Sequence, residues 1–128
     1  MSNDAPRVMV VDDDEDIRET VGMVLAASGY TAVPAVDGAD ALDLLGDEGT
    51  RPSLILLDLR MPRLSGEQVM QQLRATPALA GIPVVLMSGD GGAPETARAL
   101  GAASCLAKPI ELDDLERVVK TYAGAAHA

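Results

Sequence analysis

The chain has 128 residues and a net charge of −10, and 48% of its residues are hydrophobic while only 2% are aromatic. This length suits one domain with its own core, and the acidic charge and scarcity of aromatic side chains exclude a nucleic-acid binder that uses basic patches and base stacking. No apolar run approaches the roughly 18 residues of a membrane span, so we expect a cytoplasmic protein without a membrane segment. We predict a single domain over residues 1–128, with a core at about 6–122 and a loose tail at 123–128.

Five short apolar segments alternate with five segments in which apolar residues recur at helical spacing. The predicted strands cover residues 7–11, 31–35, 54–57, 82–87 and 105–107, and the helical patterns cover 17–25, 42–45, 69–73, 93–100 and 112–122. Gly29, Gly46 and Gly101 are predicted to end helices, and the dipeptide Asp37-Gly38 predicts a turn into the second helix.

The strand pattern predicts a parallel sheet that is covered on both faces. Residues 54–57 and 82–87 do not alternate with polar residues, as is typical of strands buried between two layers of helices. Pro34 places the second strand at an edge, and the short fifth strand, which holds the single cysteine Cys105, suits the other edge. We therefore predict a doubly wound α/β domain with five helices and a five-stranded parallel sheet in the order 2-1-3-4-5.

Polar side chains stand where four of the five predicted strands end. These are Asp12 and Asp13, Asp58, Ser88 and Lys108. The carboxyl ends of parallel strands share one edge of a sheet, so we expect these groups to meet there. Crowded carboxylates repel one another, so at least one would take up a proton unless a cation neutralised them, and oxygen ligands suit Mg²⁺. The hydroxyl and the ammonium would bind phosphoryl oxygens, and one carboxylate would be the nucleophile, although the residues alone do not decide which.

Four segments contain these residues, in this order: "VVDDD", "LILLDLRMPRLSGEQV", "VVLMSGD" and "AKPI". In them the chain resembles the receiver domain of two-component response regulators, over essentially its whole length. The resemblance implies a CheY-like, flavodoxin-like fold in which Asp58 is the phosphoacceptor. It also implies that Asp12, Asp13, Asp58 and the main-chain carbonyl of Arg60 bind the metal, Mg²⁺ or alternatively Mn²⁺.

The resemblance extends to phosphate binding and to partners. It implies that Ser88 and Lys108 bind the phosphoryl group and that the Lys108–Pro109 peptide bond is cis. The phosphoryl donor would be a phosphohistidine of a sensor histidine kinase or of a phosphotransfer protein. Phosphorylation would switch a docking face for a downstream protein, formed by the fourth helix, fifth strand and fifth helix. Such a protein turns over no external substrate, and we expect a stand-alone monomer or weak dimer that binds no nucleic acid.

Two other functions fit part of the pattern. A phosphatase of the haloacid dehalogenase kind also uses an aspartyl nucleophile and Mg²⁺, and Asp12 and Asp14 match its Asp-x-Asp after the first strand, but the chain has no cap insertion. The second alternative is a receiver-like interaction module that is never phosphorylated. Such modules usually lack one of the site residues, and this chain has all five.

Several neighbouring residues have structural interpretations. Asp14 is predicted to cap the first helix, with Glu15 and Asp16 complementing the dipole of its first turn. Asp37 is predicted to cap the second helix. Gly66 is predicted to be a turn residue with positive φ.

The chain departs from the family at position 105, where Cys105 replaces the usual Tyr or Phe that turns inward in the phosphorylated state. We therefore hypothesise that signalling depends on the glycine-rich segment 89–92 and on the fourth helix. A weak ion pair between Arg60 and Asp90 across the mouth of the site would shield the phosphoryl group from water.

Overall fold

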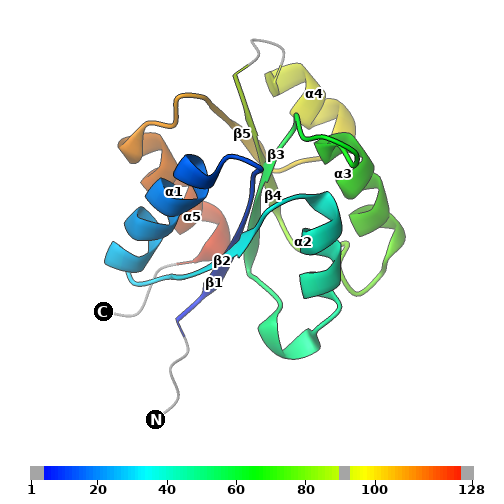
Figure 1. Cartoon of the computed structure of the whole chain (residues 1–128), viewed down its shortest axis with the longest axis horizontal. Coiled ribbons are helices and arrows are strands. Elements are labelled where there is room, and N and C mark those ends of the chain that lie inside the picture. The colour runs from blue at the N-terminus through cyan, green and yellow to red at the C-terminus, as the bar shows by residue number, and fades with distance from the viewer. Residues whose placement is uncertain (1–4, 90–92, 125–128) are drawn as a thin grey trace.

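The computed structural model describes residues 5–89 and 93–124, which form a central sheet between two layers of helices (Figure 1). The strands are β1 (Arg7–Val11), β2 (Thr31–Ala35), β3 (Leu54–Asp58), β4 (Val84–Ser88) and β5 (Ser104–Ala107). The helices are α1 (Glu15–Ala27), α2 (Gly38–Leu45), α3 (Gly66–Ala75), α4 (Ala93–Leu100) and α5 (Leu112–Ala123), and a short 3₁₀ helix, η1 (Glu48–Thr50), was not predicted. Within the described part of the chain, no helix is both long and apolar enough to cross a bilayer.

All strand pairs are parallel, and the sheet order is β2-β1-β3-β4-β5, as predicted. Pro34 lies on the edge strand β2, where its missing N–H costs no hydrogen bond to a second neighbour. The fully buried strands β3 and β4 pair Asp58 with Met87, and β4 pairs Ser88 with Ala107 of β5. This register places the last residues of three adjacent strands at the same edge of the sheet.

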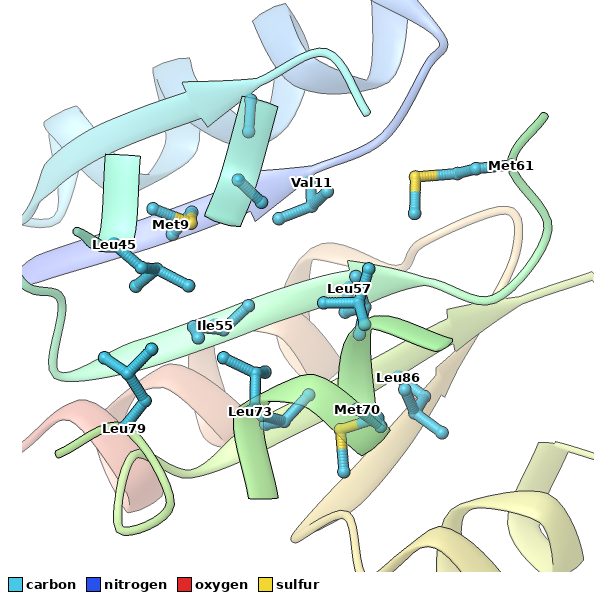
Figure 2. Packing of buried hydrophobic residues seen from close by; sticks show 14 of the residues in the cluster. Met9, Val11, Leu45, Ile55, Leu57, Met61, Met70, Leu73, Leu79 and Leu86 are labelled. Carbon is cyan, nitrogen blue, oxygen red and sulfur yellow. The ribbon is translucent and has the colours of Figure 1, made fainter. Parts of the chain in front are cut away.

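Successive residues of the central strands point to opposite faces, and both faces are packed. Met9 and Val11 of β1 join a cluster with residues of α2, α3 and α4, including Leu45 and Leu73 (Figure 2). The other face of the same strand packs against α1 and α5. Each side of the sheet is thus sealed by helices, and functional groups can emerge only at the strand ends and loops.

The helix ends follow the predicted capping residues. The Asp14 side chain accepts a hydrogen bond from the Asp16 amide, and that of Asp37 accepts one from the Asp40 amide, at 2.8 Å. Gly29 has φ 91° and Gly101 has φ 78°, as expected of helix stops that require the left-handed conformation.

The prediction for Gly66 was wrong, because the glycines with positive φ among the described residues do not include it. Gly66 is required for space. A Cβ atom at this position would lie 2.6 Å from the carbonyl oxygen of Asp58 and 2.8 Å from Cα of Leu59. The start of α3 therefore packs directly on the backbone that comes after β3.

Candidate functional site

The candidate site lies at the carboxyl edge of the sheet, where main-chain hydrogen bonds continue beyond the strands. Asp12 directly follows β1 and donates its amide to the carbonyl of Ala35, at 3.2 Å. Lys108 directly follows β5 and donates its amide to the carbonyl of Ser88, at 2.9 Å. Asp58 and Ser88 are themselves the final residues of their strands and are buried. Rigid strands thus hold the backbone of each of these residues.

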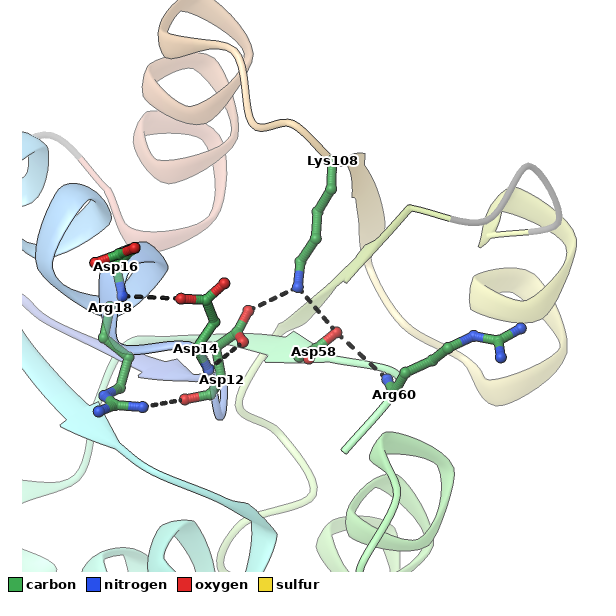
Figure 3. A network of polar contacts seen from close by, with 7 residues as sticks. All are labelled: Asp12, Asp14, Asp16, Arg18, Asp58, Arg60 and Lys108. Atoms are coloured by element: carbon green, nitrogen blue, oxygen red, sulfur yellow. Dashed lines mark hydrogen bonds and ion pairs between the residues drawn. The ribbon is translucent and has the colours of Figure 1, made fainter. Parts of the chain in front are cut away.

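The ammonium of Lys108 bridges two carboxylates from different strands (Figure 3). Its Nζ lies 2.8 Å from Oδ2 of Asp12 and 3.3 Å from Oδ1 of Asp58. The Asp12 side chain is fully buried and that of Asp58 is 6% exposed, whereas that of Lys108 is 21% exposed. The lysine therefore reaches from the solvent side onto acids that face little water.

A third carboxylate completes the acidic cluster. Asp12, Asp13 and Asp58 each offer an oxygen such that all three atoms lie within 4.8 Å of one another. Among the described residues the Lys108 ammonium is the one group that compensates the buried Oδ2 of Asp12. Three carboxylates against one ammonium leave negative charge, and an all-oxygen donor set of this kind fits a hard divalent cation such as Mg²⁺.

The pKa values report the same crowding. Burial, and next the charge of Asp12, raise the pKa of Asp58 above its usual value, although the Lys108 ammonium and the Arg60 amide act in the opposite direction. Burial acts to lower the pKa of Lys108, but its hydrogen bond and charge interaction with Asp12, followed by those with Asp58, outweigh burial and raise it. The lysine therefore stays protonated and opposes the mutual repulsion of the acids.

The loop between β1 and α1 is held by its own acidic side chains. Oδ1 of Asp12 accepts a hydrogen bond from the Asp14 amide at 2.9 Å, and Oδ1 of Asp14 accepts one from the Asp16 amide at the same distance. Asp14 is thus engaged as the cap of α1, which disfavours the phosphatase interpretation because that interpretation needs Asp14 as a partner of Asp12. Sequence reasoning missed Arg18, whose Nη1 donates to the main-chain carbonyl of Asp12 at 2.7 Å.

Other predicted features of the site have mixed outcomes. The amide of Arg60 donates to Oδ1 of Asp58 at 3.3 Å, and the role of its carbonyl stays a prediction. The Lys108–Pro109 bond is cis, as the resemblance implied. The proposed pair of Arg60 with Asp90 stays untested, because residues 90–92 lie outside the described residues.

Cys105 is half-buried and lines a cavity of about 220 Å³ between β5 and α5.

Comparison with known proteins identifies this arrangement. The sequence model described as "Response regulator receiver domain" matches residues 8–120. The chain belongs to this family. It is 34% identical over 122 residues to Protein PilG of Pseudomonas aeruginosa, which covers 94% of this chain and 89% of PilG. It is 38% identical over 111 residues to the response regulator MprA of a Mycobacterium species, which covers 85% of this chain but only 46% of MprA.

Solved structures of receiver domains share the fold. A response regulator receiver protein from Pseudomonas putida is 32% identical, with a TM-score of 0.83 over 91% of this chain and 97% of that protein. The chemotaxis protein CheY4 of Vibrio cholerae is 26% identical, with a TM-score of 0.83 over 92% of this chain and 98% of that one. The predicted CheY-like fold is confirmed, and the protein is a receiver domain of the response regulators.

Proposed function

We propose that this receiver domain accepts a phosphoryl group on Asp58 in a phosphorelay and turns that charge change into a change of protein docking. The observation that carries the proposal is the position of the Lys108 ammonium, which lies 2.8 Å from Asp12 and 3.3 Å from Asp58 beside a third carboxylate. An ammonium and a cluster of metal-type ligands around one buried carboxylate are what in-line phosphoryl transfer requires.

In the proposed transfer, Oδ of Asp58 attacks the phosphorus of a phosphohistidine. A P–O bond forms while the P–N bond breaks, and the histidine nitrogen keeps the electron pair and takes up a proton. Burial makes Asp58 a more basic carboxylate than an exposed one, and the Lys108 ammonium stands next to the oxygens on which negative charge would gather. We expect the Ser88 hydroxyl to bind another phosphoryl oxygen.

The cation that this site fits is Mg²⁺, with Mn²⁺ as an alternative. Asp12, Asp13, Asp58 and the main-chain carbonyl of Arg60 would hold it, and the ion would neutralise charge on the carboxylates and on the phosphoryl oxygens. Lys108 would then exchange its ion pair with Asp58 for one with the phosphoryl group. This exchange redistributes the charge around Lys108 at the end of β5, next to the face that is proposed to signal.

The proposed partners follow from this cycle. A sensor histidine kinase or phosphotransfer protein in the cytoplasm would supply the phosphoryl group, and a downstream protein would bind the surface formed by α4, β5 and α5. Because Cys105 lacks the usual ring, we propose that α4 and the segment that precedes it carry most of the signal. The domain would act as a switch without turning over an external substrate, as a monomer or weak dimer.

Intact-mass spectrometry after incubation with acetyl phosphate tests the proposal. The parent protein should gain one phosphoryl group in Mg²⁺ and none in excess chelator, and Asp58→Asn should gain none. Asp43→Asn, which removes an exposed acid from α2, should behave like the parent. Equal phosphorylation of the parent and Asp58→Asn would refute the assignment of the phosphoacceptor. Absence of uptake from both acetyl phosphate and a phosphorylated kinase would favour a module that is never phosphorylated.

A further inference from the structure

The side chain of Arg18 reaches from α1 back to the start of the loop that carries two acids of the site. Its Nη1 donates to the main-chain carbonyl of Asp12 at 2.7 Å, and this bond is partly buried (Figure 3). Arg18 is also the single basic residue of α1, in a stretch whose other charged residues are all acidic. Its guanidinium donates to a neutral carbonyl although several carboxylates lie near Arg18 in the sequence.

The bond matters because the carbonyl of Asp12 is linked directly to Asp13. The carbonyl of Asp12 and the amide of Asp13 belong to one rigid peptide plane, so fixing that plane fixes the N–Cα bond of Asp13 and leaves only φ as the backbone rotation that aims its side chain. Asp12 itself has other restraints, since Oδ1 accepts from the Asp14 amide and Oδ2 pairs with Lys108. Among the described residues no hydrogen bond or ion pair holds the carboxylate of Asp13, which is exposed.

We propose that Arg18 is a positioning residue of the metal site, which aims the Asp13 carboxylate by fixing the peptide plane between Asp12 and Asp13. This inference rests on the proposed function, because it assumes that the acidic cluster binds Mg²⁺. It goes beyond that function in assigning a role to a residue outside the cluster. Groups that orient metal ligands from outside the coordination shell typically change metal affinity by about 10–100-fold when they are removed.

The positioning role and the charge of Arg18 have opposite effects on metal binding. A guanidinium near the site repels a dication, so its removal should tighten Mg²⁺ binding if electrostatics were its only influence. If Arg18 positions Asp13, its removal should weaken Mg²⁺ binding despite the lost repulsion. The sign of the change therefore separates the two roles.

Isothermal titration of the full chain with Mg²⁺ measures this sign. We expect Arg18→Ala to raise the Kd about tenfold or more, and Arg18→Lys, which keeps a positively charged hydrogen-bond donor, to recover part of the loss. The matched control is Arg51→Ala, because Arg51 also donates to a main-chain carbonyl, that of Leu45 at 3.3 Å, but precedes β3 at the opposite edge of the sheet. Arg51→Ala should lower the melting temperature about as much as Arg18→Ala does, and it should leave the Mg²⁺ affinity unchanged.

A measurement without metal makes the outcomes distinguishable. Amide hydrogen exchange of Asp14, which donates to Oδ1 of Asp12, should become at least severalfold faster in Arg18→Ala than in the parent or in Arg51→Ala. If the parent fails to bind Mg²⁺, the proposed function fails, and the exchange rate still shows whether Arg18 orders the loop. If the parent binds Mg²⁺ while Arg18→Ala binds it equally or more tightly, the positioning role is refuted and the proposed function stands.

Discussion

Replacing Gly66 by alanine tests how the fold holds the candidate phosphoacceptor. The new Cβ would lie 2.6 Å from the carbonyl oxygen of Asp58. An ordinary van der Waals contact begins near 3.4 Å, so these two atoms must move apart by about 0.8 Å. Both atoms nearest to it belong to the main chain and cannot rotate away as a side chain would. The amide of Gly66 also donates to the carbonyl of Leu59 at 3.1 Å, which ties α3 to this backbone.

Overpacking of this kind typically costs about 1–3 kcal/mol, which for a chain of this size lowers the melting temperature by several degrees, about 3–10 °C. The displaced backbone carries Asp58, and a misplacement approaching 1 Å costs up to about 100-fold in rate. Thermal and urea denaturation followed by circular dichroism measure the first effect. Phosphorylation by acetyl phosphate, followed by intact mass, measures the second.

The matched control is Gly22→Ala in α1. A Cβ at Gly22 would meet only Cβ of Ala32, at 3.8 Å, which is an ordinary contact. Alanine in a helix interior is favoured over glycine by about 1 kcal/mol, so this variant should be more stable than the parent and be phosphorylated at the same rate. If Gly66→Ala matched the parent in stability and phosphorylation, the argument from backbone contact would be refuted.

Two further predictions concern Asp58 and Arg63. The raised pKa of Asp58 means that this group favours folding below its unfolded pKa and that the benefit is lost as the pH rises through the folded pKa. Asp58→Asn should therefore unfold at a higher temperature than the parent at pH 7 without Mg²⁺, by a margin that shrinks towards pH 4; a margin independent of pH would contradict this. Arg63 has φ 67°, so Arg63→Gly should stabilise the fold by about 1 kcal/mol in urea denaturation, and a clear loss would contradict the assigned strain.

The fold was predictable because its signals are local in sequence. Unbroken apolar runs indicated buried parallel strands, and Pro34 indicated an edge strand, which together decided the strand order. The predicted bounds of the strands were less accurate than their order. For example, β4 begins at Val84, although the apolar run that predicted it begins at Ile82. Pro83 explains part of this shift, because it has no N–H to donate to a neighbouring strand.

The members of the candidate site could be found without any distance, because parallel strands bring their carboxyl ends to one edge. The contacts that orient them could not be found in this way. Arg18 sits in an acidic stretch, and its contact with a main-chain carbonyl depends on the path of the loop. The spacing of residues predicts which face of α1 carries Arg18, but it does not predict that a carbonyl is turned towards that face.

Gly66 shows why a glycine is hard to interpret from sequence alone. A glycine before a helix is explained equally well by a positive φ and by a close approach of another segment, and these explanations predict different outcomes for substitution. A positive φ would make Gly66→Ala a local strain that leaves Asp58 in place. A close approach transmits the overlap to the main chain of Asp58 itself. The phosphorylation rate of Gly66→Ala therefore distinguishes close packing between α3 and β3 from strain in a turn. A loss of stability alone would fit both explanations.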